Sequence, residues 1–221
     1  MVGDREVWFR DGTSDSLILN KTLNPKEKPE YVFPEFPAKT ILDIGANIGI
    51  LALKLGHLYP DATIHAFEPE PENFSILEKN VAGMDRIKIY PFGLGGADGK
   101  MTLNKSDDPT NFGGYSLWGV GSGAAHCEVE IRSLAGWLKE ARIDSVDLIK
   151  IDAEGAEYDI LSCLSDDILE RVTYVAGELH GVKDFEILTR LEKFFHLGID
   201  RPLFQRNYGF QAFAKSRQVI E

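Results

Sequence analysis

The sequence predicts an α/β fold in which a mostly parallel central sheet is covered by helices on both faces. Short apolar runs rich in β-branched residues alternate with segments whose apolar residues recur at helical spacing. Strands that alternate with helices in this way form βαβ units, which build a parallel sheet. The chain has 221 residues, 43% of them hydrophobic, which is enough for one core. We therefore expect a single domain over residues 1–221.

The expected strands are short apolar runs bounded by turn residues. Residues 127–131 differ slightly, because apolar and charged side chains alternate there, as in a strand with one buried face. A hairpin partner is expected after the turn Ala97-Asp98-Gly99. In chain order, the expected strands are residues 41–44, 63–67, 86–91, 100–104 (the hairpin partner), 127–131, 146–151, 172–179 and 211–214.

The expected helices carry apolar residues three or four positions apart. The segment 71–81 is the clearest case, because Leu77 and Val81 share one face. Gly83 follows it, and glycine is the common residue just beyond a helix C-terminus. In chain order, the expected helices are residues 48–58, 71–81, 134–142, 156–164 and 184–195.

Two segments fit neither pattern. Residues 1–37 precede the first strand and are expected to pack on the core as an N-terminal element, with Arg10 and Asp15 as an ion pair that pins it. Residues 105–125 contain five glycines together with Ser, Asn and Asp. Long loops in compact domains are often functional, so we expect this segment to be a loop that either closes over the site as a lid or packs its aromatic residues beneath it, and the sequence does not decide between the two.

The bulk composition restricts the classes of function. The net charge of -11 and the pI near 5.0 argue against nucleic acid as a partner, because phosphate binding relies on a surplus of Lys and Arg. The two cysteines, Cys127 and Cys163, are too few for a disulfide scaffold. The sequence shows no apolar signal segment and no apolar run of membrane-spanning length. We expect a cytoplasmic protein that does not enter a membrane.

The first expected strand ends at a charged residue within an apolar stretch, TILDIGANIGIL. Asp43 begins the pattern D-x-G-x-N-x-G, which ends at Gly49 and leads into the next helix. Ligands of parallel sheets bind beyond the C-terminal ends of the strands, so this loop predicts a ligand site. A dinucleotide loop would have the pattern GxGxxG and present bare amides to phosphate. Asp43 would instead repel phosphate and attract a cation, which favours S-adenosylmethionine, a sulfonium that also carries an ammonium group.

Glu68 supplies the second half of the predicted cofactor site. It follows the second strand, nineteen residues after Gly49, where an acid can accept hydrogen bonds from both ribose hydroxyls. This spacing suits either kind of nucleoside cofactor, so the acid at the head of the loop decides between them. In the alternative interpretation, Asp43 only caps the turn and Glu68 is a solvated strand end. The presence of both acids in one βαβ unit argues against it.

Several stretches carry a family resemblance. WFRDGTSD, LDIGANIGI and AFEPEPENFSILEKN are similar to an opening element, a cofactor loop and a second-strand segment, and NFGGYSL resembles a Gly-Ser loop more loosely. SLAGWLKEARIDSVDLIKIDAEGAEYDIL ends in a distinctive Lys-Ile-Asp-x-Glu-Gly-x-Glu signature. Together they resemble FkbM-type S-adenosylmethionine-dependent methyltransferases. The resemblance implies a Rossmann-like class I methyltransferase fold and methyl transfer, usually to a hydroxyl oxygen of a small molecule or sugar.

The expected cofactor-binding residues follow the first three strands and the strand 146–151. They are Asp43, Gly45, Ala46, Asn47, Gly49, Glu68, Pro69, Gly93 and Asp152.

The expected catalytic residues are Asp152, Glu178 and His180, which end two neighbouring strands. Methyl transfer mainly requires alignment of the two reactants, but a hydroxyl acceptor must also lose its proton to a base or near a metal. We predict His180 as the general base, since an ordinary imidazole accepts a proton near neutral pH. Asp152 would orient the acceptor or the cofactor. Asp152 would also hold a divalent metal with Glu178 or His180, should the enzyme use one.

Plainer alternatives stay open at these positions. Glu154 and Glu157 also fit acids that stabilise the start of the helix 156–164 through its dipole. His180 also fits a solvated histidine at a strand end. At the level of function, the alternatives are a nucleic-acid methyltransferase and a non-catalytic nucleoside-binding module of the same fold. The sequence does not determine the acceptor, the metal dependence or the oligomeric state.

Overall fold

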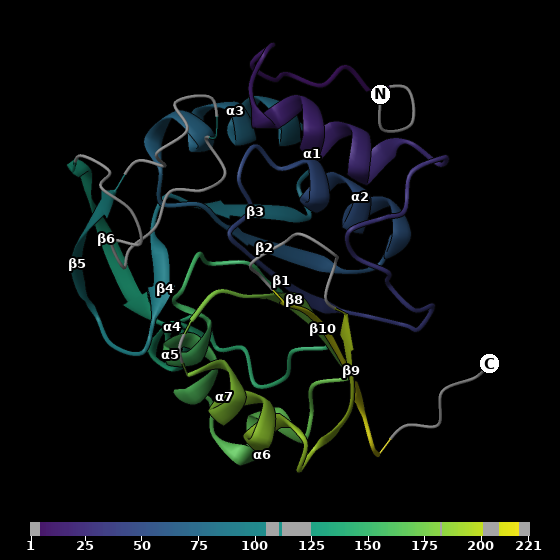
Figure 1. Ribbon diagram of the computed structural model, residues 1–221, viewed down its shortest axis with the longest axis vertical. Coiled ribbons are helices and arrows are strands. Elements are labelled where there is room, and N and C mark those ends of the chain that lie inside the picture. Colours follow the sequence, from purple (N-terminus) through teal and green to yellow (C-terminus); the bar gives the residue numbers. More distant parts are fainter. Residues whose placement is uncertain (1–4, 105–110, 112–124, 182, 201–207, 217–221) are drawn as a thin grey trace.

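The computed structural model describes residues 5–104, 111, 125–181, 183–200 and 208–216 (Figure 1). Its main sheet has seven strands in the order β3-β2-β1-β7-β8-β10-β9, parallel throughout except for β10. The α/β class and the mostly parallel sheet are therefore confirmed. The strands are β1 (Thr40–Ile44), β2 (Thr63–Phe67), β3 (Ile87–Tyr90), β7 (Leu148–Ile151), β8 (Tyr174–Leu179), β9 (Phe195–Asp200) and β10 (Tyr208–Ala214).

Helices cover both faces of this sheet. In Figure 1, α1, α2 and α3 lie on one side, and α4, α5, α6 and α7 lie on the other. Each side has its own apolar cluster: Leu55 and Leu77 belong to the first, and Trp137 and Ile160 to the second. The helices are α1 (Ser14–Leu23), α2 (Ile50–Leu58), α3 (Pro71–Val81), α4 (Leu134–Glu140), α5 (Glu157–Ser162), α6 (Asp166–Leu169) and α7 (Asp184–Leu191).

A second sheet of three strands, β4-β6-β5, stands at one side of the molecule (Figure 1). It consists of β4 (Gly93–Gly95), β5 (Gly99–Asn104) and β6 (Ala125–Ser133). The segment expected as a hairpin partner is β5, and it pairs antiparallel with β6 rather than with the strand before it. Only Asn111 of the residues between these two strands is described, so the predicted lid over residues 105–125 lies outside the described residues.

Several elements differ from the expectations. The helix expected over 184–195 ends at Leu191, and Phe195 begins β9. Phe195 is fully buried and pairs with Ala214 of β10, so pairing with β10 overrides the local helical pattern. The structure also contains α1, α6, β4 and β9, which the sequence pattern did not predict.

The N-terminal element is anchored to the core by a buried acid. Asp15 is fully buried, and its carboxylate accepts hydrogen bonds from the backbone amide (2.9 Å) and the guanidinium (2.9 and 3.0 Å) of Arg10. Arg10 also donates to Asn73 Oδ1 at 2.6 Å, and Asn73 lies on α3. The ion pair expected between Arg10 and Asp15 is thus present. It joins the segment before α1 to α1, and the bond to Asn73 joins the same segment to α3.

Among the described residues, no helix is both long enough and apolar enough to cross a membrane.

His65 on β2 gives the fold a pH dependence away from the candidate site. Its Nδ1 is 2.8 Å from Tyr90 Oη and its ring packs against Trp137, and burial together with the charge of Lys88 lowers its pKa from 6.5 to about 4. The unfolded chain therefore gains a proton between pH 6.5 and 4 that the folded chain does not, so stability falls as the pH falls.

We expect His65→Phe to abolish that part of the acid destabilisation. Because His65 is partly exposed, the effect is about 1–2 kcal/mol of unfolding free energy between the two pH values. Urea unfolding at several pH values measures it, with the exposed His57→Phe on α2 as the matched control. A pH profile for His65→Phe that parallels that of the unsubstituted protein would contradict the assignment.

Candidate functional site

The loop after β1 makes two sharp turns that only glycine accommodates well. Gly45 has φ +74° and Gly49 has φ +82°, in the left-handed region. A Cβ at Gly45 would overlap the carbonyl oxygen of Asp152, and a Cβ at Gly49 would overlap the Leu77 side chain. Any larger residue would therefore separate the loop from β7 or from α3.

A buried ion pair between β1 and β7 holds this loop in place. Lys150 on β7 lies opposite Asp43 in the sheet register, and its Nζ is 3.5 Å from Asp43 Oδ1. The same ammonium donates to the carbonyl oxygens of Gly45 (2.7 Å) and Ile44 (3.3 Å). Burial raises the pKa of Asp43, and Lys150 opposes that rise. Lys150 thus fixes the turn that begins the loop.

Asp43 lies differently from what the sequence predicted. It is fully buried, and it is not among the residues that line the cavity. Neither of its carboxylate oxygens accepts a hydrogen bond within the described part of the chain. The carboxylate that we expected to face the cation of the cofactor therefore faces the ammonium of Lys150. Lys150 belongs to the quoted signature, but its role could not be predicted from the sequence.

Glu68 joins the two loops that follow β1 and β2. It is 6% exposed, and its oxygens accept hydrogen bonds from the backbone amides of Asn47 (2.8 Å) and Glu70 (3.0 Å). Burial raises its pKa to about 7, although these hydrogen bonds favour the carboxylate. Glu68 is therefore held rigidly at the end of β2, on the wall of a cavity.

The cavity measures about 330 Å³. Of the predicted cofactor residues, Asp43 and Gly49 do not line it. Leu17 and Lys21 of α1 also form part of its wall, although the sequence marked neither of them as a site residue. The predicted residues that line it are Gly45, Ala46, Asn47, Glu68, Pro69, Gly93 and Asp152.

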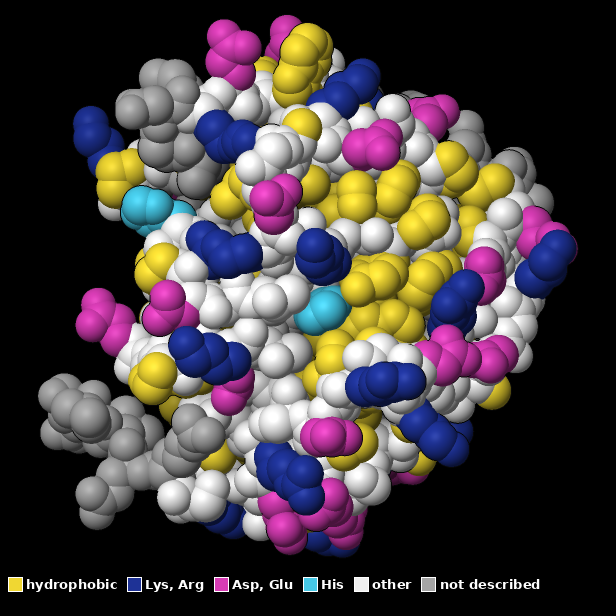
Figure 2. Space-filling model, turned by 180° about the vertical axis from the view of Figure 1, so that it is seen from behind, with side chains coloured by type: hydrophobic (Ala, Val, Ile, Leu, Met, Phe, Trp, Pro, Cys, Tyr) yellow, Lys and Arg dark blue, Asp and Glu magenta, His cyan; other side chains and the backbone are white. Residues whose placement is uncertain are grey.

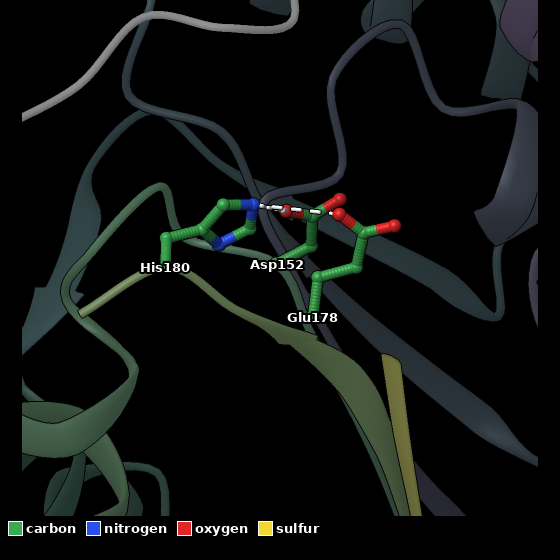
Figure 3. Close-up of side chains that lie close together, drawn as sticks. All are labelled: Asp152, Glu178 and His180. Carbon is green, nitrogen blue, oxygen red and sulfur yellow. Dashed lines mark ion pairs between the residues drawn. The ribbon is translucent and has the colours of Figure 1, made fainter. Parts of the chain in front are cut away.

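The ends of β7 and β8 bring the predicted catalytic residues together (Figure 3). The Nε2 atom of His180 lies 3.4 Å from Glu178 Oε2 and 3.9 Å from Asp152 Oδ1. In Figure 3 the ring and both carboxylates point toward a common centre. One ligand atom from each of the three residues lies within 4.8 Å of the others. The three side chains therefore lie together at the ends of β7 and β8, although His180 does not line the cavity, and their roles stay predictions.

Glu157 holds one member of this cluster, His180, in place. It is fully buried at the start of α5, and it accepts hydrogen bonds from the amides of Ala153 (2.9 Å) and Gly155 (3.0 Å). Its Oε1 also lies 3.0 Å from Nδ1 of His180. Burial raises the pKa of Glu157, but the hydrogen bond and charge of His180 together with backbone hydrogen bonds lower it overall. Glu157 therefore does more than stabilise a helix dipole, because it fixes both the loop after β7 and the imidazole.

The protonation of His180 differs from the assumption behind its predicted role. Burial lowers its pKa, but the hydrogen bonds with Glu157 and Glu178 and the charges of Asp152 and Glu154 raise it to about 11. Without a ligand, the ring therefore carries a proton at neutral pH. The assumption of an ordinary imidazole pKa is wrong for this state, because the sequence could not show how many acids converge on the ring.

Tyr31 completes the wall and was not predicted as a site residue. Its hydroxyl donates to Asp152 Oδ2 at 3.1 Å, and the ammonium of Lys150 lies 5.8 Å from the centre of its ring. Burial and the charge of Asp152 raise the pKa of Tyr31, so the hydroxyl stays a donor. It lies in the irregular segment between α1 and β1, where no periodic pattern marks a functional residue.

Comparison with known proteins identifies the family. Residues 43–212 match the family described as the methyltransferase FkbM domain. The chain belongs to the FkbM methyltransferase family. The matched region begins at Asp43 and ends in β10, so it contains the cofactor loop, Glu68 and the acid–histidine cluster. This match confirms the prediction that the protein is an S-adenosylmethionine-dependent methyltransferase.

The chain is also similar to individual methyltransferases in sequence and to a solved structure in fold. The chain is 29% identical over 167 residues to the 2-O-methyltransferase NoeI of Sinorhizobium fredii, covering 70% of this chain and 65% of that protein. It is 25% identical over 193 residues to the hexuronic acid methyltransferase AglP of Haloferax volcanii, covering 84% and 71%. A crystal structure of a fibrillarin/Nop5p complex shares the fold, with a TM-score of 0.50, 15% identity and coverage of 83% and 76%.

We predict that Lys150→Met destabilises the protein by about 3 kcal/mol, because it leaves the buried carboxylate of Asp43 without its cation. Adding Asp43→Asn to this variant should recover part of the loss, since the isolated charge is then removed. Urea unfolding measures both effects. The exposed strand lysine Lys88 provides the control variant, Lys88→Met. A cost for Lys150→Met no greater than that of the control would contradict the role of the ion pair.

Cofactor affinity should depend on the ionisation of Glu68. Its pKa of about 7 means that the carboxylate is mostly ionised at pH 8 and mostly protonated at pH 6. A protonated acid loses acceptor capacity toward ribose hydroxyls, so the Kd for S-adenosylmethionine should rise about tenfold from pH 8 to pH 6. Calorimetric titration measures it. In Glu68→Gln the affinity should be weaker and nearly independent of pH, and a pH slope equal to that of the unsubstituted protein would contradict the role.

Proposed function

We propose that this protein transfers the methyl group of S-adenosylmethionine to a hydroxyl oxygen of a small molecule or sugar. The observation that carries the proposal is a single cavity that Glu68 and the cofactor loop share with Asp152 and Glu178. Such a cavity can hold a nucleoside cofactor beside a group of acids able to handle a hydroxyl proton. The names of two relatives add support, since one is a 2-O-methyltransferase and the other a hexuronic acid methyltransferase.

In the proposed reaction the acceptor oxygen attacks the methyl carbon in line with the sulfur. The new C–O bond forms as the S–C bond breaks, the hydroxyl proton passes to a carboxylate of the cluster, and S-adenosylhomocysteine leaves. Alignment supplies most of the rate, about 7–11 kcal/mol of the barrier. Tyr31 and Glu157 contribute by holding Asp152 and His180 in fixed orientations.

We further propose that Asp152, Glu178 and His180 hold a divalent cation. Two carboxylates and an imidazole are a donor set that suits magnesium or manganese, and their ligand atoms lie within 4.8 Å of one another. Glu157 holds Nδ1 of His180 and leaves Nε2 directed at the two acids, and metal-bound histidines are commonly held by a carboxylate at their other ring nitrogen in this way. When bound, the cation would lower the pKa of the acceptor hydroxyl.

The charge distribution supports a small acceptor over a nucleic acid. The chain carries a net charge of -11. On the face drawn in Figure 2, basic and acidic side chains are interspersed around an apolar area, and the side chains coloured by type form no continuous basic track there. Binding along a phosphate backbone relies on such a track.

Removal of metal should abolish methyl transfer. The assay follows S-adenosylhomocysteine formed from S-adenosylmethionine with a panel of neutral sugars, hexuronic acids and phenols. We expect EDTA to stop turnover and Mg²⁺ or Mn²⁺ to restore it. Asp152→Asn, Glu178→Gln and His180→Asn should each lower kcat by about 10²-fold or more, and the Glu178 and His180 variants should still bind the cofactor. The exposed His57→Asn serves as control.

Two outcomes would contradict parts of this account. Activity that survives EDTA but is lost in His180→Asn would reject the metal and show that His180 acts on the reactants without one. Tight cofactor binding with no turnover on any acceptor class would instead favour a non-catalytic nucleoside-binding module.

A further inference from the structure

A second cavity of about 380 Å³ adjoins the first. Its walls come from the segment between α1 and β1, and from β8, β9 and β10. Tyr174 fixes that segment above the sheet, because its hydroxyl donates to the carbonyl oxygen of Val32 at 2.6 Å. The segment is therefore held in place over the strands, and the space between them forms a groove.

Two strand glycines, which have no side chain, form part of the floor of this groove. Gly209 lies opposite Glu178 in the pairing of β10 with β8, and Gly198 lies opposite Gln211 in the pairing of β9 with β10. A Cβ added at Gly198 would meet nothing nearer than the carbonyl oxygen of Gln211 at 4.0 Å. Glycine inside a strand weakens it and often marks a place where a ligand approaches the backbone closely.

Gln211 is a polar residue in an otherwise apolar and glycine-containing strand, YGFQAFA. It is half-buried and lines the groove. Its side-chain amide makes no hydrogen bond within the described part of the chain. A partly buried amide offers two donors and an acceptor, so it favours a ligand that can both accept and donate hydrogen bonds.

The groove opens onto the predicted catalytic groups. Glu178 and Tyr31 line both cavities, and Lys21 and Glu30 lie at their common border, where Lys21 Nζ is 3.1 Å from Glu30 Oε1. A molecule on the glycine floor would thus reach Glu178 at one end, beside Asp152 and His180. Charged and amide groups surround it together with the Tyr31 ring, a combination that suits a polyhydroxylated ring better than an apolar one.

We propose that this groove binds the methyl acceptor, and that the acceptor is a sugar whose ring lies on Gly198 and Gly209 and is hydrogen-bonded by Gln211. The inference rests on the proposed function and adds to it the location of the acceptor and its chemical class. The sugar hydroxyl nearest Glu178 receives the methyl group from S-adenosylmethionine and loses its proton to the acid cluster, which leaves S-adenosylhomocysteine.

The test uses two variants that alter the groove in different ways. Gly198→Val fills the floor, and Gln211→Leu removes the amide at nearly constant volume. Gly99→Val on β5 is the matched control, because a Cβ there also meets no atom within 4 Å and lies in a different sheet. Each protein is assayed with S-adenosylmethionine and four probes: the methyl glycosides of glucose, galactose and glucuronic acid, and 2-naphthol as an apolar hydroxyl compound.

We expect the unsubstituted protein and the control to methylate at least one glycoside in preference to 2-naphthol. Gly198→Val and Gln211→Leu should lower kcat/KM for that glycoside about tenfold or more, chiefly through KM. Their Kd for S-adenosylmethionine, measured by calorimetry, should match that of the unsubstituted protein, which also shows that they fold.

Three results would overturn the inference: unchanged kcat/KM in both groove variants, methylation of 2-naphthol alone, or transfer to none of the four probes while the cofactor binds. Failure of the unsubstituted protein to bind S-adenosylmethionine would instead reject the proposed function itself. The glucose and glucuronic acid glycosides also distinguish a neutral from an acidic sugar.

Discussion

The buried pair of Lys150 and Asp43 is the interaction on which the site depends. It joins the C-terminal ends of β1 and β7, the two strands that carry the cofactor loop and the acid cluster. The ammonium also binds the carbonyl oxygens that begin the loop, so one cation sets both the turn at Gly45 and its distance from Asp152. A buried ion pair gives little net stability, but breaking it is costly, and here it fixes a geometry.

The same strand ends gather more negative than positive charge. His180 is surrounded by acids, and the buried ammonium of Lys150 is already engaged by Asp43. Burial and the neighbouring acids raise the pKa of Asp152 and raise that of Glu154 to about 8, and a cation, either the sulfonium of the cofactor or a divalent metal, would favour their ionised forms. The acids around His180 are Asp152, Glu154, Glu157 and Glu178. The charge imbalance therefore fits a site for positively charged ligands.

The sequence predicted those parts of the molecule whose signals are local. Hydrophobic runs and spacing mark the strand that carries Asp43, the glycines of its loop, and Glu68. In the structure that strand is β1, the glycines form the turns after it, and Glu68 follows β2. The helix α1 was missed because Leu17, Ile18 and Leu19 are consecutive, so no helical stripe stands out. The roles of Lys150 and Tyr31 depend on contacts across more than 100 residues, and the pKa of His180 depends on acids from two strand ends. Those are properties of the assembled fold.

The most direct measurement is a calorimetric titration of the cofactor-free protein with S-adenosylmethionine, S-adenosylhomocysteine and NAD in parallel. The match to the methyltransferase family, together with the acid at the end of β2, predicts that both sulfur nucleosides bind at one site per chain and that NAD does not. Binding of NAD alone, or no binding of either sulfur nucleoside to a folded protein, would contradict the account of the site.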